Sequence, residues 1–176
     1  NLYGADLRGA YLDNVNMRYT ILINADLRGA NLHQADLSGA QLNGARTGSL
    51  LATSAIGCPY SLPTDFRCVE GSTDAGSALK SLMGPGADLS DSEFHNFQET
   101  NLNLYDSNMQ NSHFYNLNMN GANMSNADLS GATLENVNLY NSDLSGTDLT
   151  GVSWTNVICP AGGNSDDNGN TCENNL

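Results

Sequence analysis

The four cysteines, Cys58, Cys68, Cys159 and Cys172, are the residues whose chemistry is easiest to predict from this sequence. Three pairings are open to them, and loop closure favours near neighbours, Cys58 with Cys68 and Cys159 with Cys172. A zinc site is the competing interpretation, but neither pair has C-x₂₋₄-C spacing and no histidine lies near them in the sequence. We therefore expect two disulfides and an oxidising compartment.

A calcium loop is a second chemistry that the spacing allows. Asn164, Asp166, Asn168 and Gly169 satisfy N-x-D-x-N-G, in which alternate side-chain oxygens converge on the ion. The twelfth position of such a loop holds Asn175 instead of a bidentate Glu. The alternative is an Asp- and Asn-rich turn that lies inside a disulfide and caps the C-terminal end. Apart from this calcium candidate, we expect no cofactor.

Catalytic motifs do not occur in the sequence. There is no G-x-S-x-G, Walker, H-E-x-x-H or dinucleotide-binding pattern. His33, His95 and His113 all fall at outward positions of the repeat described below, where we expect them to contribute to solubility. The sequence therefore predicts a protein that is not an enzyme.

Charge is distributed unevenly along the chain. The 176 residues include 6 Lys+Arg and 19 Asp+Glu, for a formal charge of −13, which has the wrong sign for direct binding to nucleic acid or to an anionic membrane. Residues 1–46 hold four acidic residues and four arginines, whereas residues 87–157 hold nine acidic residues and neither Lys nor Arg. No apolar run approaches the ~20 residues of a membrane helix, so we expect no membrane insertion.

The sequence repeats with a period of five residues, and this repeat decides which of the side chains named above face outward. A period of five matches neither the 3.6 of a helix nor the alternation of a flat strand, so the chain must turn every five residues. Within each unit, a small residue and the central apolar residue face one way, and the Asp or Asn between them faces the other. This pattern predicts a solenoid with a Leu-rich interior. The central residues of the first run are Leu2, Leu7, Leu12, Met17, Leu22, Leu27, Leu32, Leu37 and Leu42.

The pattern A-(D/N)-L-x-x over residues 2–46 and 87–157 resembles the pentapeptide-repeat family. The resemblance implies an all-β fold, a right-handed quadrilateral β-helix of about 5–6 coils with one disulfide-braced insertion. The identical hexapeptides at 5–10 and 25–30 also favour four units per coil. The two cysteine-bearing stretches are similar to those of exported, cyanobacterial-type members, which implies an exported protein of the periplasm, thylakoid lumen or extracellular space.

The frame of the repeat divides the chain into four parts. We expect a first repeat block at 1–46, an insertion at 47–86, a second repeat block at 87–157 and a disulfide-closed cap at 158–176. Within the insertion, the segment 75–83 has the apolar spacing of a short helix.

Glu99 is the one polar residue among the central positions of the second block. A buried carboxylate normally needs a partner or takes up a proton. We favour a local slip or bulge of the frame, in which Phe97 and Leu102 take the central role and Glu99 turns outward. The alternatives are that Phe97 and Leu102 occupy the small-residue positions and distort the coil, or that Glu99 marks a site.

The expected function is that of a non-enzymatic scaffold or protein-interaction module with an unidentified protein partner, acting as a monomer rather than a dimer. The expected interaction surface combines Asp88, Asp128 and Asp148, which would stack in one outer column, with Tyr60 and Phe66 of the insertion. The alternative, implied by family members that protect against quinolones, is an acidic DNA mimic that binds a DNA-processing enzyme such as a type II topoisomerase.

Overall fold

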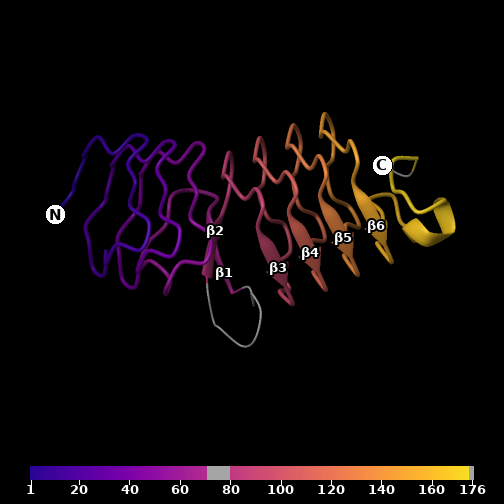
Figure 1. Cartoon of the computed structure of the whole chain (residues 1–176), viewed down its shortest axis with the longest axis horizontal. Coiled ribbons are helices and arrows are strands. Elements are labelled where there is room, and N and C mark those ends of the chain that lie inside the picture. Colours follow the sequence, from indigo (N-terminus) through magenta and orange to yellow (C-terminus); the bar gives the residue numbers. More distant parts are fainter. Residues whose placement is uncertain (71–79, 175–176) are drawn as a thin grey trace.

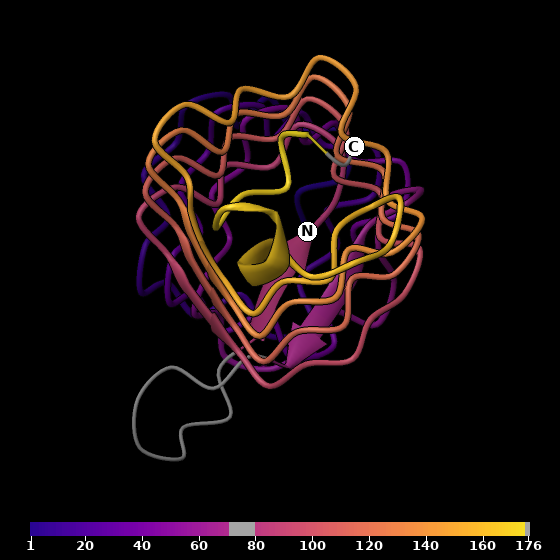
Figure 2. The same ribbon diagram turned by 90° about the vertical axis from the view of Figure 1, so that its right-hand side faces the viewer.

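The protein coils into a rod whose successive turns stack along its long axis (Figure 1). The structure, a computed structural model, describes residues 1–70 and 80–174. Viewed along the axis, the turns superpose on one four-sided outline (Figure 2). The fold is therefore the β-helix that the five-residue period predicts. Among the described residues, no helix is long and apolar enough to cross a membrane.

Each corner of the coil combines two local features of the repeat. The corner residue is Asn, Gly or another residue with a φ near +60°, for example Asn101 at 55° and Gly121 at 71°, which is the left-handed conformation that these two residue types adopt most readily. The Asp or Asn before each central residue then accepts a hydrogen bond from the backbone two residues later, as in Ser130 N to Asp128 Oδ1 at 2.9 Å. These Asx turns explain why Asp and Asn recur in the sequence.

Stacked coils pair through parallel bridges between residues twenty apart. On one face they form a four-stranded parallel sheet of β3 (Glu93–His95), β4 (His113–Tyr115), β5 (Thr133–Glu135) and β6 (Ser153–Thr155). Its register aligns the buried side chains Phe94, Phe114, Leu134 and Trp154, which confirms the interior column expected from the period. The rings of Phe94 and Phe114 stack with their centroids 5.2 Å apart.

The first block extends further than the sequence indicated. Parallel bridges continue with Asn31 to Leu51, Asp36 to Ile56 and Gln41 to Ser61, so an insertion that starts at residue 47 is wrong. The repeat is hard to recognise in the sequence here because the central positions hold Thr47 and Ala52 instead of Leu. Both side chains are buried, as the central residues of other units are. The β-helix of the first block therefore continues past residue 46, as far as Ser61.

The chain leaves the coil after Ser61 and rejoins it at Asp88, which bridges to Leu51 across thirty-seven residues instead of twenty. The excursion contains the antiparallel strands β1 (Arg67–Glu70) and β2 (Lys80–Met83), and β2 also pairs with the first block through an antiparallel bridge from Lys80 to Ala55. The expected helix at 75–83 is therefore wrong for residues 80–83, and its remainder lies outside the described residues. A short strand that is buried on both faces has the same apolar run as a helix segment.

The frame does not slip at Glu99. The corner conformations at Asn96 and Asn101 keep the five-residue spacing, and Gln98 bridges to Asn118 in register. Phe97 and Leu102 are buried at the positions that small residues occupy in other units, and Glu99 stays in the central position, half-buried. The favoured slip is therefore wrong. The coils that stack on Phe97 also hold large buried apolar residues at this position, Leu117 and Val137.

Replacing Glu99 with Met should raise the free energy of unfolding by about 1 kcal/mol, because the carboxylate is half-buried in an apolar column and has no hydrogen bond to the described residues. Urea denaturation measures the change. The same substitution at the outward-facing Glu135 is the control and should have little effect. A loss of stability in Glu99→Met would show that the carboxylate stabilises the joint.

The two disulfides have the pairing that loop closure predicted. Cys58 bonds to Cys68 and joins the first block to β1, and Cys159 bonds to Cys172 at the C-terminal end. Between the second pair lies η1 (Ser165–Asn168), a 3₁₀ turn that covers the end of the last coil (Figure 2). The amide of Ser165 donates to Val157 O at 2.8 Å, and its hydroxyl accepts from Val157 N at 3.0 Å. The cap therefore satisfies backbone groups of the final coil.

Candidate functional site

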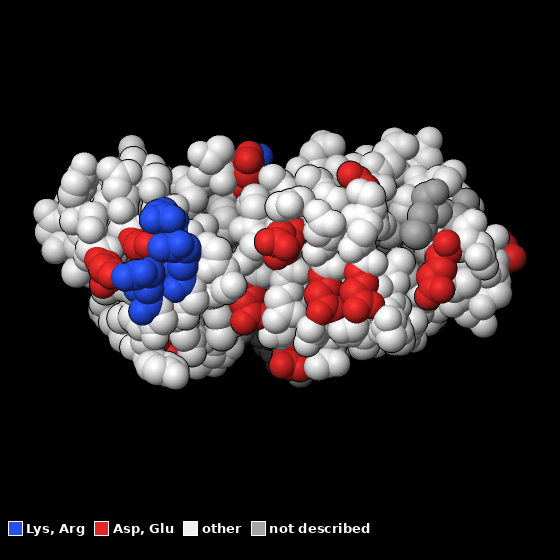
Figure 3. Space-filling view, turned by 90° about the horizontal axis from the view of Figure 1, so that it is seen from above, with Lys and Arg blue, Asp and Glu red and all other residues white. Residues whose placement is uncertain are grey.

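Three carboxylates, Asp88, Asp128 and Asp148, form a column on the outside of the second block, which we call the acidic surface. They stack in register with Asn108, through the bridges Asp88 to Asn108, Asn108 to Asp128 and Asp128 to Asp148. Asp88 and Asp128 are half-buried and Asp148 is exposed. One face of the molecule shows acidic side chains scattered over the second block and a cluster of basic side chains over the first block (Figure 3).

Local hydrogen bonds hold these carboxylates in position. Partial burial disfavours the ionised form of Asp128, but hydrogen bonds from Gln110 and Ser130 outweigh this effect and lower its pKa below the ordinary value of 3.8. Asp88 accepts from Ser90 N and Asn108 Nδ2, and Asp148 accepts from Thr150 N at 2.9 Å. These hydrogen-bond partners are all neutral.

Arginines form ion pairs with most of the acidic residues of the first block. Arg8 contacts Asp6 at 2.7 Å and Arg28 contacts Asp26 at 2.6 Å, and Arg46 lies 3.5 Å from the same Asp26. The hydrogen bond from Arg8 lowers the pKa of Asp6 to about 2. Because the second block has no Lys or Arg, the negative charge of the rod is concentrated there.

The two aromatic residues expected at the interaction surface have different environments. Tyr60 is 82% exposed. Phe66 is 4% exposed, and its ring occupies the space that a side chain at position 84 would need, which is available because residue 84 is Gly. Its assignment to an interaction surface is therefore wrong. The aromatic type alone did not reveal whether the excursion folds back onto the core.

The candidate calcium ligands take part in hydrogen bonds of the cap. Asn164 Oδ1 accepts from Asp166 N at 2.9 Å, Asp166 Oδ1 accepts from Asn156 N at 2.7 Å, and Asn168 Nδ2 donates to Asn164 O at 2.9 Å. These bonds are those expected of a capping turn. Calcium binding by the three residues stays a prediction.

The histidines do face outward, but each lies in a more specific environment than the sequence indicated. His33 Nδ1 is 3.0 Å from Thr53 Oγ1. His95 and His113 lie 5.9 Å apart between ring centroids, beside Tyr115 on the outer side of β3 and β4. His95 and Tyr115 are twenty residues apart, so the four-unit coil places them side by side. This spacing could have indicated the cluster from the sequence. Among the described residues, no group of three or more His, Cys, Asp or Glu side chains is arranged to hold a metal ion.

The repeat geometry agrees with a comparison with known families. A family model described as pentapeptide repeats matches eight copies, at residues 10–46, 85–131 and 118–153. The chain belongs to the pentapeptide-repeat family. The right-handed quadrilateral β-helix of this pentapeptide-repeat protein is the fold of that family, whose members are in general structural or interaction modules.

Solved structures similar to this pentapeptide-repeat protein include two cyanobacterial proteins and one plant protein. Rfr23 of Cyanothece 51142 is 21% identical, with 88% of this chain and 84% of that chain covered and a TM-score of 0.33. HetL of Nostoc sp. strain PCC 7120 is 26% identical, with 92% and 64% covered and a TM-score of 0.31. A protein of the Arabidopsis thaliana thylakoid lumen is 24% identical, with 86% and 69% covered and a TM-score of 0.22. A comparison with curated proteins gives no match.

Proposed function

We propose that this pentapeptide-repeat protein is a non-enzymatic interaction module whose acidic surface binds a basic surface of a partner protein. The observation that carries the proposal is the ordered column of Asp88, Asp128 and Asp148, whose hydrogen-bond partners among the described residues are neutral. Carboxylates that are already fixed by backbone bonds lose little conformational freedom when a partner binds. An array of like charge also accelerates encounter with a surface of opposite charge.

The proposed compartment is an oxidising one outside the cytosol, such as a periplasm, a thylakoid lumen or the extracellular space. All four cysteines are in disulfides, and disulfides persist in such compartments. Direct binding to nucleic acid is not part of the proposal, because the formal charge of −13 repels the phosphate backbone.

The test is affinity capture from the source compartment with the wild-type protein and the triple variant Asp88→Asn, Asp128→Asn, Asp148→Asn. Asn already occupies the equivalent positions at 108 and 138, where it accepts the same Asx-turn bond, so the variant should keep the fold. We expect the captured partner to bind the triple variant at least about tenfold more weakly, with an affinity for wild type that falls as salt rises.

The matched control removes three negative charges elsewhere, with Glu135→Gln, Asp143→Asn and Asp167→Asn. This control should bind the partner as wild type does. An equal loss of affinity in both variants would show that binding depends on net charge and not on the acidic surface. Unchanged affinity of the triple variant would also reject the acidic surface as the binding site. A gyrase supercoiling assay with the same three proteins identifies the case in which the basic partner is a type II topoisomerase.

A further inference from the structure

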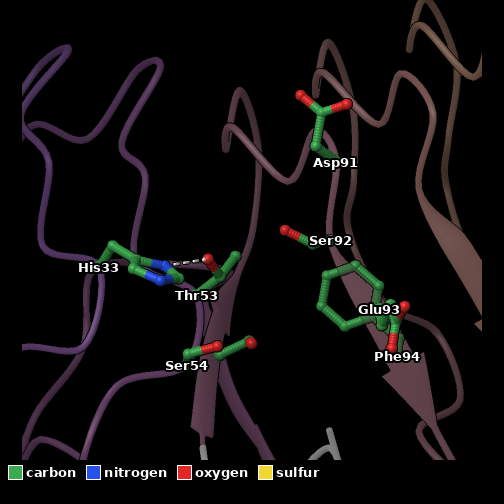
Figure 4. Close-up of a pocket in the computed structure, with 8 residues that line it drawn as sticks. His33, Thr53, Ser54, Asp91, Ser92, Glu93 and Phe94 are labelled. Carbon is green, nitrogen blue, oxygen red and sulfur yellow. Dashed lines mark hydrogen bonds between the residues drawn. The ribbon is translucent and has the colours of Figure 1, made fainter.

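A cavity of about 230 Å³ lies at the joint between the two repeat blocks. β2 pairs with β1 and with the first block, whereas β3 pairs with β4. Among the described residues, no backbone bond joins β2 to β3, and the cavity lies in this gap. His33 and Thr53 lie on one side of it and Asp91 and Ser92 on the other (Figure 4). The lining residues are His33, Thr53, Ser54, Ser81, Asp91, Ser92, Glu93 and Phe94.

The backbone of Glu93 presents a hydrogen-bond donor at this cavity. In each later coil the equivalent amide donates to the coil before it, as in His113 N to Ser92 O at 2.8 Å and Thr133 N to Ser112 O at 2.9 Å. At the joint, the carbonyl of Ala55 instead accepts from Lys80 N at 2.8 Å. Within residues 1–70 and 80–174, the amide of Glu93 therefore has no bond equivalent to those of its counterparts.

Two side chains add donor and acceptor capacity at the same place. Ser81 is only 7% exposed, and its hydroxyl has no hydrogen bond to the described residues. His33 uses Nδ1 toward Thr53, which leaves Nε2 for a ligand. The Ser81 hydroxyl oxygen is not among the fully enclosed polar atoms of the described residues, so it is open to the cavity, where a ligand can pair with it.

Carboxylates supply the remaining acceptors. Asp91 accepts from Asn111 Nδ2 through Oδ1 at 3.1 Å, which leaves Oδ2 without a bond to the described residues. Glu93 makes a 3.5 Å contact with His95 and is otherwise unengaged in the described part of the chain. The described residues that line the cavity include neither Lys nor Arg.

We propose that this cavity binds a small, neutral, polyhydroxylated ligand of monosaccharide size. A hydroxyl group both donates and accepts, so it matches unpaired donors and carboxylate acceptors that lie together. An ammonium ion only donates and leaves the Glu93 amide without an acceptor, whereas an anion is repelled by the two carboxylates. The volume corresponds to about eight waters at ~30 Å³ each, which is room for one sugar ring. The proposal is independent of the acidic surface, none of whose residues lines the cavity.

The test is a titration of ¹⁵N-labelled protein followed by amide chemical shifts. The probes are D-glucose, D-mannose and myo-inositol, with 1,4-diaminobutane as the cation and sodium acetate as the anion. We expect saturable shifts at Ser81 and Glu93 with at least one of the three polyols. Asp91→Asn and Ser81→Ala should each weaken that binding about tenfold, because each removes one hydrogen-bonding group.

The matched control is Asp106→Asn, because Asp106 is also an acidic corner residue, with a φ of 58° against 53° for Asp91, but does not line the cavity. Asn is a favourable corner residue, so both variants should fold. Binding by Asp106→Asn should equal that of wild type. The proposal is overturned if no polyol gives saturable shifts, if only the diamine or acetate does, or if Asp91→Asn and Ser81→Ala bind as wild type does.

Discussion

Replacing Phe114 with Ala should lower the free energy of unfolding by about 3–5 kcal/mol. The ring is 1% exposed and stacks on Phe94, with the planes inclined by 19°. Hydrogen-bonded coils on both sides hold Phe94 and Leu134 in register, so the column cannot collapse into the space that the ring leaves. Guanidinium denaturation followed by far-ultraviolet circular dichroism measures the loss.

The control for Phe114→Ala is Tyr11→Ala, which removes an aromatic ring that is 88% exposed. This change should alter the free energy of unfolding by less than about 0.5 kcal/mol. A loss below about 1 kcal/mol for Phe114→Ala would contradict the interior column, because a residue outside the core leaves no cavity.

Removal of the second disulfide should be the next largest effect. The double variant Cys159→Ala, Cys172→Ala should lose about 3 kcal/mol, because this disulfide closes a loop with a sequence separation of 13. The loop also carries the cap, and a solenoid depends on capped ends. Trp154 is the single tryptophan and is buried in the last coil, so its fluorescence reports directly on this end.

The first disulfide serves as the comparison. The double variant Cys58→Ala, Cys68→Ala opens a loop of similar separation, 10 residues, away from the C-terminal end. It should destabilise the protein without shifting the Trp154 emission of the folded state, whereas loss of the cap should shift that emission to longer wavelength. Identical Trp154 emission and unfolding in wild type and the Cys159→Ala, Cys172→Ala variant would contradict the capping role.

Most of the fold and part of the candidate site could be predicted because they depend on local spacing. The turn every five residues follows from the corner preferences of Asn and Gly and from the Asx turns, and these interactions lie within a few residues of one another. The acidic column follows from the same period, because residues twenty apart stack. The pairing of the cysteines followed from loop length.

The errors concern the joint, where contacts between distant residues decide the structure. Phe66 is buried because a glycine eighteen residues later leaves space for its ring. The segment 80–83 is a strand because the carbonyl of Ala52 and both backbone groups of Ala55 are available to it. Glu99 keeps its frame because the stacked coil at Asn118 holds it in register. None of these partners is close in the sequence.

The sequence by itself determined the period, the inside and outside of each unit, the two disulfides and the concentration of negative charge in the second block, because each depends on residue type and short spacing. Only the tertiary structure decided how the excursion returns to the coil. That return places β2 against the first block, and in the described part of the chain it leaves the Glu93 amide without the backbone bond that its counterparts make. The cavity lies at this joint because the carbonyl of Ala55 accepts from Lys80 of β2 and is therefore not available to Glu93 of β3. Ser81 and Glu93 both line it.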